Sequence, residues 1–264
     1  MSDKPILLSR DNHVATIMIN RPRVMNALTS ETLSFLLSAF QELGTDPDVR
    51  VIVLEGAGGN FSTGADMSLL GASAEPLQSL RHMKDPVGKL ILAIKKTPQP
   101  VICKVRGNAV GYAVGLALAG DFAIAADDAK FCEAFVNLGI SLDGGASYFL
   151  PRLVGMAKAK EIALLGDVIS GKEAASLGLI YKSVPEEQLD SQTGLLIERL
   201  LSKSGKALSF IKEGLEKNAD ADLEAALERE AAYQAVLLAG DEIKAAVKFF
   251  QDSRKNKAEK TGSG

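Results

Sequence analysis

The stretch PVICKVRGNAVGYAVGLALAGDFAIAADDAKFCEAFVNLGISLDGGASYFLPRLVG, residues 100–155, organises the chain. A β-branched run at 101–105 predicts a buried strand, and a turn leads from it into a small-residue apolar segment at 111–120. Strand, tight turn and glycine-lined helix start leave free backbone N–H groups at the helix N-terminus, where negative charge is stabilised. A second strand-like run follows at 121–126, and then one acid, Asp143, before a glycine pair. This arrangement predicts a site that forms and holds an oxyanion.

Composition narrows the class of protein. Of 264 residues, 47% are hydrophobic and 24% are charged, with a net charge of −3, which is ordinary for a globular protein. The slightly acidic balance gives no reason to expect a nucleic-acid partner. The longest uncharged apolar stretch, 109–120, is shorter than the roughly 18 residues that a membrane span needs, and the N-terminus lacks a signal-peptide pattern. We therefore expect a cytoplasmic protein that binds neither nucleic acid nor membrane.

Metal and dinucleotide sites are not expected. Cys103 and Cys132 lie in apolar strand-like runs and are interpreted as buried packing residues of a reducing compartment. His13 and His82 are far apart and lack ligand spacing, so a zinc site is not indicated. The glycine cluster at 56–59 lacks the last glycine and the acid of a dinucleotide-binding fingerprint.

The rest of the chain indicates a mixed α/β core followed by helices. Strand patterns at 6–8 and 14–19, a helix capped by Thr29 and a buried strand at 51–54 form a first βαβ unit. From residue 186 to 250 the pattern is helical throughout. We expect an α/β core over 1–195, a helical C-terminal region over 196–252 and a disordered tail over 253–264.

Five segments resemble the crotonase (enoyl-CoA hydratase/isomerase) superfamily. They are NRPRVMNALT at 20–29, FSTGADMSLL at 61–70, GNAVGYAVGLALAGDFAIAADDAKF at 107–131, NLGISLDGGASYFLPRLVG at 137–155 and GLIYKSV at 178–184. Together they cover most of the chain in the family's order and spacing. The resemblance implies a spiral of ββα units with a helical C-terminal trimerisation region. It also implies an acyl-CoA thioester substrate, no further cofactor, and assembly as a homotrimer or hexamer.

The resemblance further implies which groups hold the substrate. A thioester enolate would be held by the backbone N–H groups of Ala65 and Tyr112, each of which follows a glycine at the start of a helix. The family usually has glycine where Tyr112 stands, so this side chain must point away from the thioester or narrow the pocket. The implied substrate-binding residues are Val24, Ala27, Gly64, Asp66, Met67, Gly111, Phe135 and Phe249.

The two glutamates of family hydratases are missing. By alignment they fall on Gly115 and Phe135, neither of which can transfer a proton, so hydration of the two-acid kind is not expected. Asp143 stands where several isomerase branches carry their single acid. A carboxylate with a raised pKa, walled by Phe135 and Phe149, would suit a proton shuttle. Asp143 could also be a helix N-cap, and Glu133 is interpreted as a surface acid at a strand end.

The leading hypothesis is an enoyl-CoA isomerase that converts 3-enoyl-CoA to 2-enoyl-CoA with Asp143 as acid and base. Such a reaction adds no water, so it needs only one proton-transferring group. The alternatives are a ring-modifying acyl-CoA isomerase of aromatic degradation, a weak enoyl-CoA hydratase and a non-catalytic acyl-CoA-binding trimer. The presence of Asp143 counts against the last of these.

Overall fold

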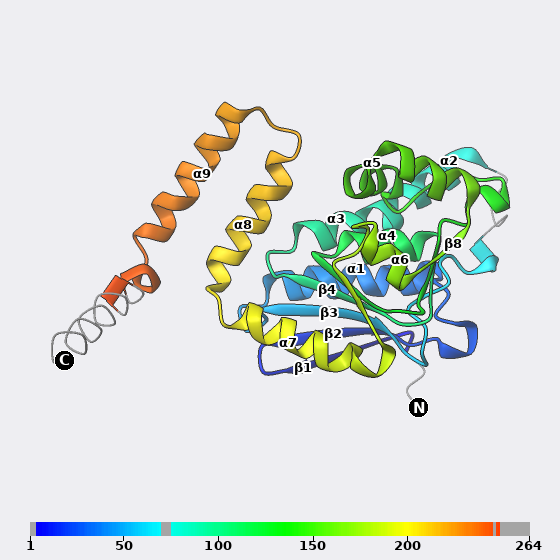
Figure 1. The fold of residues 1–264 in the computed structure, drawn as a ribbon, viewed down its shortest axis with the longest axis horizontal. Coiled ribbons are helices and arrows are strands. Elements are labelled where there is room, and N and C mark those ends of the chain that lie inside the picture. Colours follow the sequence, from blue (N-terminus) through cyan, green and yellow to red (C-terminus); the bar gives the residue numbers. More distant parts are fainter. Residues whose placement is uncertain (1–3, 70–74, 245–246, 249–264) are drawn as a thin grey trace, which may run out of the picture. The chain divides into compact units, whose positions relative to one another are not determined.

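The computed structural model describes residues 4–69, 75–244 and 247–248. The chain divides into two compact units between Ser202 and Lys203. The boundary predicted after residue 195 lies within helix α7 (Leu189–Leu201) of the first unit (Figure 1). The predicted tail, 253–264, lies outside the described residues.

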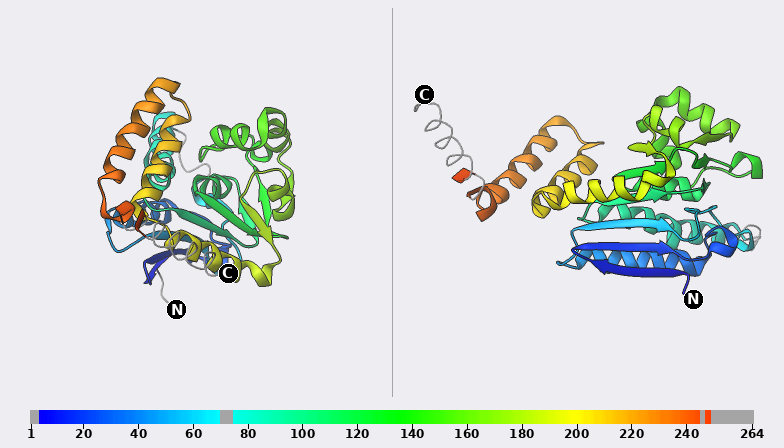
Figure 2. Two further views of the ribbon diagram at one scale, coloured as in Figure 1. Left: turned by 60° about the vertical axis from the view of Figure 1, so that its left-hand side comes forward. Right: turned by 60° about the horizontal axis from the view of Figure 1, so that its bottom comes forward.

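A six-stranded sheet forms the base of the first unit, with strand order β1-β2-β3-β4-β6-β9 (Figure 2). All neighbours are parallel except β1 and β2. Its strands are β1 (Ile6–Asp11), β2 (Val14–Ile19), β3 (Val51–Gly56), β4 (Val101–Val105), β6 (Phe122–Ala126) and β9 (Lys182–Val184). Strand β1 is longer than the strand pattern predicted at 6–8, because it continues through Asp11, and the chain turns at Asn12 and His13, which both have positive φ.

A second sheet of three strands carries the turns of the site. It contains β5 (Asn108–Val110), β7 (Lys130–Cys132) and β8 (Val168–Ser170), in that order. The chain passes from β4 in the large sheet to β5 in the small one, through a helix, and then to β6 and β7 in the same two sheets. This alternation is the predicted spiral of ββα units, and it confirms the predicted α/β class.

Helices cover both faces of the large sheet. The helices of the first unit besides α7 are α1 (Ser30–Thr45), α2 (Pro76–His82), α3 (Lys89–Lys96), α4 (Tyr112–Ala119), α5 (Ala146–Leu165) and α6 (Gly171–Ser176). Shorter turns of helix cover Pro22–Val24, Met67–Leu69, Met83–Gly88, Val136–Leu138 and Glu186–Gln188. Thr29 caps α1 as predicted, because its side chain accepts the Thr32 N–H at 3.2 Å.

Two neighbouring residues of β4 show which helix covers which face of the large sheet, because successive side chains of a strand point to opposite faces. Cys103 Sγ donates to the Leu116 carbonyl of α4 at 3.5 Å, whereas Lys104 Nζ pairs with Asp190 of α7 at 2.9 Å. Helix α4 therefore packs on one face and α7 on the other. Every residue of α4 is buried, as its unbroken apolar sequence requires. Both cysteines, Cys103 and Cys132, are free and buried as expected.

The second unit contains α8 (Gly205–Asn218) and α9 (Leu223–Leu238), which contact each other. The rings of Phe210 and Tyr233 stack between them with centroids 4.7 Å apart. Large apolar side chains such as Leu215 and Leu223 remain more than two-thirds exposed, at 71% and 73%.

Within the described ranges, no helix has the length and apolar character needed to cross a bilayer.

Candidate active site

The segment that carries Ala65 lies between two stretches of backbone. Ser62 forms a bridge with Ala109 of β5, and Ala65 forms one with Leu28. The Leu28 carbonyl accepts the Asp66 N–H at 2.9 Å, so Ala65 itself directs its N–H away from Leu28. Backbone pairing alone therefore brings this segment beside the chain that leads into α4.

Two glycines allow a close approach at this point. Gly64 has φ +81°, and a Cβ atom there would lie 2.4 Å from the Val110 carbonyl oxygen and 3.5 Å from the Tyr112 nitrogen. Gly111 has φ 55° and ψ −123°, a conformation open only to glycine, and turns the chain into α4. Neither the Ala65 nor the Tyr112 N–H has an acceptor among the described residues. The structure thus brings the two predicted donors together with their N–H groups free.

The Tyr112 side chain is held inside the protein. It is 4% exposed, and its hydroxyl donates to the Val87 carbonyl at 2.9 Å. Its ring packs on Gly144, where an added Cβ would lie 2.9 Å from the ring edge. Burial and then the charge of Asp143 raise the pKa of Tyr112 well above its usual range, so the hydroxyl stays neutral. The Tyr112 ring thus supports the Gly144 turn, while its N–H lies at the start of α4.

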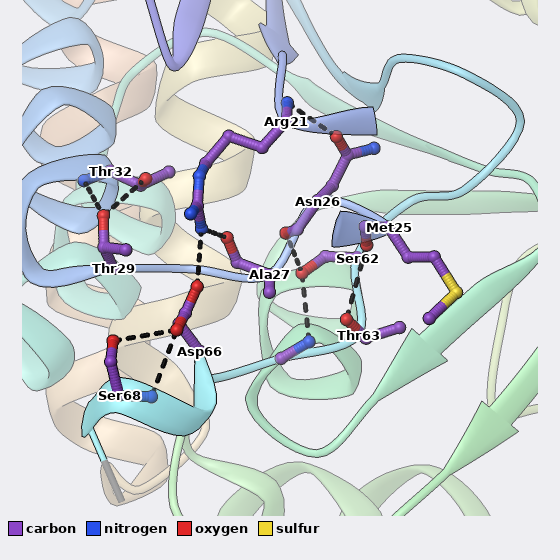
Figure 3. A network of polar contacts seen from close by, with 11 residues as sticks. Arg21, Met25, Asn26, Ala27, Thr29, Thr32, Ser62, Thr63, Asp66 and Ser68 are labelled. Atoms are coloured by element: carbon purple, nitrogen blue, oxygen red, sulfur yellow. Dashed lines mark hydrogen bonds and ion pairs between the residues drawn. The ribbon is translucent and has the colours of Figure 1, made fainter. Parts of the chain in front are cut away.

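Arg21 connects Ala27, which precedes the Leu28 that pairs with Ala65, to Asp66, which follows Ala65 (Figure 3). Its guanidinium donates to the Ala27 carbonyl and pairs with Asp66 Oδ2 at 2.9 Å. Asp66 Oδ1 accepts the N–H and the hydroxyl of Ser68 at 3.1 and 2.8 Å. Hydrogen bonds from Ser68 and Arg21 lower the pKa of Asp66, which keeps the pair charged. The predicted substrate-binding residues Ala27 and Asp66 are therefore part of a rigid frame around the Ala65 donor.

A buried asparagine, which the sequence does not single out as a site residue, completes this frame (Figure 3). Asn26 is fully buried, and its Nδ2 donates to the carbonyls of Ala57 and Asn60 at 2.8 and 2.6 Å. Its carbonyl accepts the Ser62 hydroxyl at 2.8 Å, and that hydroxyl accepts the Gly64 N–H at 3.1 Å. The only signal in the sequence is a polar residue between apolar ones in NALT, which does not by itself indicate burial.

The other predicted substrate-binding residues differ in exposure. Val24 and Met67 are surface side chains, 44% and 71% exposed. Phe135 is 6% exposed, and its ring lies 3.6 Å from where a Cβ atom of Gly111 would be. It therefore packs directly on the glycine that precedes the Tyr112 donor. Phe249 lies outside the described residues.

Backbone fills the place of the first hydratase acid. A Cβ atom on Gly115 would lie 2.4 Å from the Gly144 carbonyl oxygen and 3.0 Å from the Gly144 Cα. No side chain fits there unless the Gly144 turn moves. Since Phe135 occupies the second position, neither hydratase acid has a counterpart at its own place.

Asp143 is not a helix cap, so that alternative interpretation is wrong. Helix α5 is preceded by Gly145 and has no side-chain cap; Asp143 contributes only its backbone carbonyl, to the Ala146 N–H at 3.0 Å. Its Oδ1 is buried and has no hydrogen-bond partner among the described residues. Burial raises the pKa of Asp143 to about 6. Phe149, 7% exposed, packs on the adjoining Gly145, as the predicted apolar wall requires.

Glu133 is not a surface acid, so that prediction is wrong. It is 1% exposed, and neither carboxylate oxygen has a partner in the described part of the chain. The β5–β7 pairing continues one step beyond β5, where the Gly111 N–H donates to the Cys132 carbonyl at 2.8 Å, so Glu133, the next residue, lies alongside Gly111. Burial, and then the charge of Asp143, raises the pKa of Glu133 to about 8. Two carboxyl groups with separated pKa values can divide the roles of acid and base.

Comparison with known proteins connects this geometry to a family. Residues 9–260 match the family model described as enoyl-CoA hydratase/isomerase. The chain is 31% identical to trans-2-decenoyl-(acyl-carrier-protein) isomerase of Streptococcus mutans, over 97% of this chain and 98% of that one. It is 34% identical to crotonyl-CoA hydratase of Syntrophomonas wolfei over the same shares. A crystal structure of enoyl-CoA hydratase from Mycobacterium smegmatis matches with a TM-score of 0.90 and 27% identity, over 95% of this chain and 97% of that one.

Proposed function

Since the chain belongs to the enoyl-CoA hydratase/isomerase family and is an enzyme of that family, we propose that it converts 3-enoyl-CoA to 2-enoyl-CoA. One observation carries the choice of isomerisation over hydration. The Gly144 backbone fills the place of one hydratase acid, next to Asp143, whose buried Oδ1 has no hydrogen-bond partner among the residues that the structure describes. The turn at Gly144 thus leaves no room for the hydratase acid, and the residue before it, Asp143, is the single acid that an isomerase needs.

The first step is the removal of a proton from C2. The thioester oxygen would accept the N–H groups of Ala65 and Tyr112, and the Asp143 carboxylate would take the proton. The C2–H electron pair then forms the enolate, whose negative charge lies on the oxygen that the two donors hold. Preorganised backbone donors at a helix start stabilise such a charge without reorganising during the reaction.

The second step returns a proton to C4, so that the double bond moves from C3–C4 to C2–C3. A carboxyl group with a pKa of about 6 is mostly ionised at neutral pH but still readily protonated, which suits a group that must take and return a proton. No water is consumed, so the absence of carboxylates at positions 115 and 135 is no obstacle.

The carrier and the acyl group belong to the same proposal. The family acts on acyl-CoA thioesters, and we assign this enzyme a CoA thioester, although the Streptococcus mutans relative is named for an acyl-carrier-protein substrate. The buried Phe135 ring on Gly111 places an aromatic surface beside the donors, which favours a ring-modifying isomerase as the second candidate.

We further propose that the enzyme works in the cytoplasm as a homotrimer or hexamer and uses no cofactor beyond the CoA of its substrate. Two free, buried cysteines are typical of a reducing compartment. The exposed leucines of α8 and α9 supply apolar area that assembly would cover.

The test is a rate comparison on three substrates. We expect the purified enzyme to form the conjugated thioester from a 3-enoyl-CoA, measured by ultraviolet absorbance, and to hydrate crotonyl-CoA far more slowly. An aromatic acyl-CoA epoxide distinguishes the ring-modifying alternative. Hydration at ordinary enzyme rates, about 1–10³ per second, together with slow isomerisation would refute the proposal.

A further inference from the structure

In the described part of the chain, Glu133 has no hydrogen-bond partner that would explain its burial. Both carboxylate oxygens lack hydrogen bonds and ion pairs among the described residues, and the side chain is 1% exposed. A carboxyl group that serves only the fold is normally paired or hydrogen-bonded when it is buried, because an unpaired charge is costly there. An orphaned, buried acid beside a reaction site is therefore a candidate for proton transfer.

The β5–β7 pairing places Glu133 in the wall of the site. Val110 pairs with Cys132, and the Gly111 N–H donates to the Cys132 carbonyl, so the next residue, Glu133, lies alongside Gly111. Gly111 directly precedes the Tyr112 donor, and the Phe135 ring packs on the same glycine. Glu133 therefore belongs to the strand end that lines the start of α4, close to the expected thioester.

The described titratable side chains around Glu133 include one, Asp143, that is ionised near neutral pH. The titratable groups that interact with it are Asp143 before α5 and Cys132 on β7, and Tyr112 at the start of α4 faces Asp143 as well. Burial raises the pKa of both the Tyr112 hydroxyl and the Cys132 thiol, so both stay neutral. Of these three described groups, only Asp143 carries a charge near neutral pH, and that charge favours a protonated Glu133.

We propose that Glu133 is the second proton-transferring group of this site, the acid that protonates C4 while Asp143 acts as the base at C2. The inference rests on the proposed isomerase function and deepens it. It assigns a catalytic residue at a position that differs from both hydratase acid positions, 115 and 135.

The step balances without a co-reactant. The Asp143 carboxylate takes the C2 proton, and the C2–H electron pair forms the enolate. The Glu133 O–H bond breaks as its proton joins C4; the C3=C4 π electrons form the new C4–H bond. The enolate electrons then form C2=C3 and restore the thioester carbonyl. A proton passing from Asp143 to Glu133 returns both groups to their starting states.

The test measures whether deuterium is transferred from C2 of the substrate to C4 of the product. A 3-enoyl-CoA carrying deuterium at C2 is converted in ordinary water under single-turnover conditions, and deuterium at C4 of the product is measured by mass spectrometry. The wild-type enzyme should place little deuterium at C4, because that proton comes from Glu133. In Glu133→Gln, Asp143 alone must carry the proton, so the deuterium at C4 should rise severalfold. Turnover should fall on the order of tenfold, less than the 10²–10⁴-fold typical of losing the only acid–base group.

A pH profile gives a second readout that a merely structural residue would not change. Activity needs Asp143 ionised and Glu133 protonated, so wild-type kcat/KM should fall below about pH 6 and above about pH 8. Glu133→Gln should keep the acidic limb and lose the alkaline one. The exposed Glu187→Gln is the matched control and should leave label transfer and both limbs unchanged.

The outcomes separate the two proposals. Equal deuterium at C4 in the wild type and in Glu133→Gln, with the alkaline limb kept, would overturn the role of Glu133 and leave the isomerase assignment intact. Absence of any isomerisation by the wild type would overturn the assignment itself. If Glu133→Gln does not fold, the wild-type arm still decides, since high deuterium transfer to C4 there contradicts the proposal.

Discussion

Replacing Asp143 with asparagine should separate the catalytic from the structural contribution of this residue. Asparagine keeps the size of the side chain but cannot accept the C2 proton. Because Asp143 does not cap α5 and its Oδ1 has no partner among the described residues, the change removes no hydrogen bond seen at that oxygen. We therefore expect turnover of 3-enoyl-CoA to fall by about 10²–10⁴-fold.

The same substitution should stabilise the fold at neutral pH. Burial raises the pKa of Asp143 to about 6, so folding disfavours its ionised form. The unfolded chain loses this proton near pH 4, and the folded chain only near pH 6. The stability that Asp143 contributes is thus present below pH 4 and lost as pH rises through 6. At about 1.4 kcal/mol per pKa unit, the cost above pH 6 is on the order of 3 kcal/mol, which Asp143→Asn should recover in part.

The assays are steady-state isomerisation and urea unfolding at pH 5 and pH 7.5. We expect the gain in unfolding free energy to be larger at pH 7.5, with CoA affinity nearly unchanged. Asp128→Asn, which alters an exposed aspartate in the turn after β6, serves as the control and should change neither activity nor stability. Normal turnover in Asp143→Asn, or a loss of stability at pH 7.5, would refute the assigned role.

Three further changes test the frame of the site and the assembly. Gly115→Ala would place Cβ 2.4 Å from the Gly144 carbonyl oxygen, so we expect a loss of about 1–3 kcal/mol and lower turnover, whereas Gly194→Ala in α7 meets open space and should be tolerated. Asn26→Ala removes the donor to two partly buried carbonyls, those of Ala57 and Asn60, and should cost about 1–3 kcal/mol in urea unfolding and reduce kcat. Sedimentation should detect trimers or hexamers at micromolar concentration; a stable monomer would contradict the predicted assembly.

The backbone part of the site could be predicted from the sequence because its determinants are local. Glycines at 64 and 111 precede the two donors, and each permits a backbone conformation that other residues rarely adopt. The single acid before the glycine pair was equally visible, and so was the α/β alternation around it. These features depend on short stretches of sequence. The pairing of Ala65 with Tyr112 was implied by the family resemblance instead, and the structure brings Gly64, which precedes Ala65, close to the Tyr112 nitrogen.

The burial of Glu133 and the steric role of Gly115 could not be predicted from the sequence. The end of β7 gives no sign in the sequence that its pairing with β5 continues to Gly111, alongside which Glu133 lies buried. Similarly, Gly115 marks a missing acid in the sequence, but its steric role depends on contact with Gly144, which is distant along the chain. The burial of Glu133 and the contact between Gly115 and Gly144 both arise from tertiary packing. The order of the segments in the sequence does not determine how closely they pack in space.

The Gly144 turn contacts both Gly115 and Tyr112 and directly follows Asp143. Its carbonyl fills the space beside Gly115, and its backbone supports the Tyr112 ring, whose hydroxyl is tied to Val87. Because the turn lies so close to α4, the preceding residue, Asp143, is carried into the apolar site and its pKa rises. The charge that Asp143 then carries favours a protonated Glu133. One close approach of glycine backbone thus excludes the hydratase acid, positions a base and keeps a neutral acid near it, which together favour proton transfer over the addition of water.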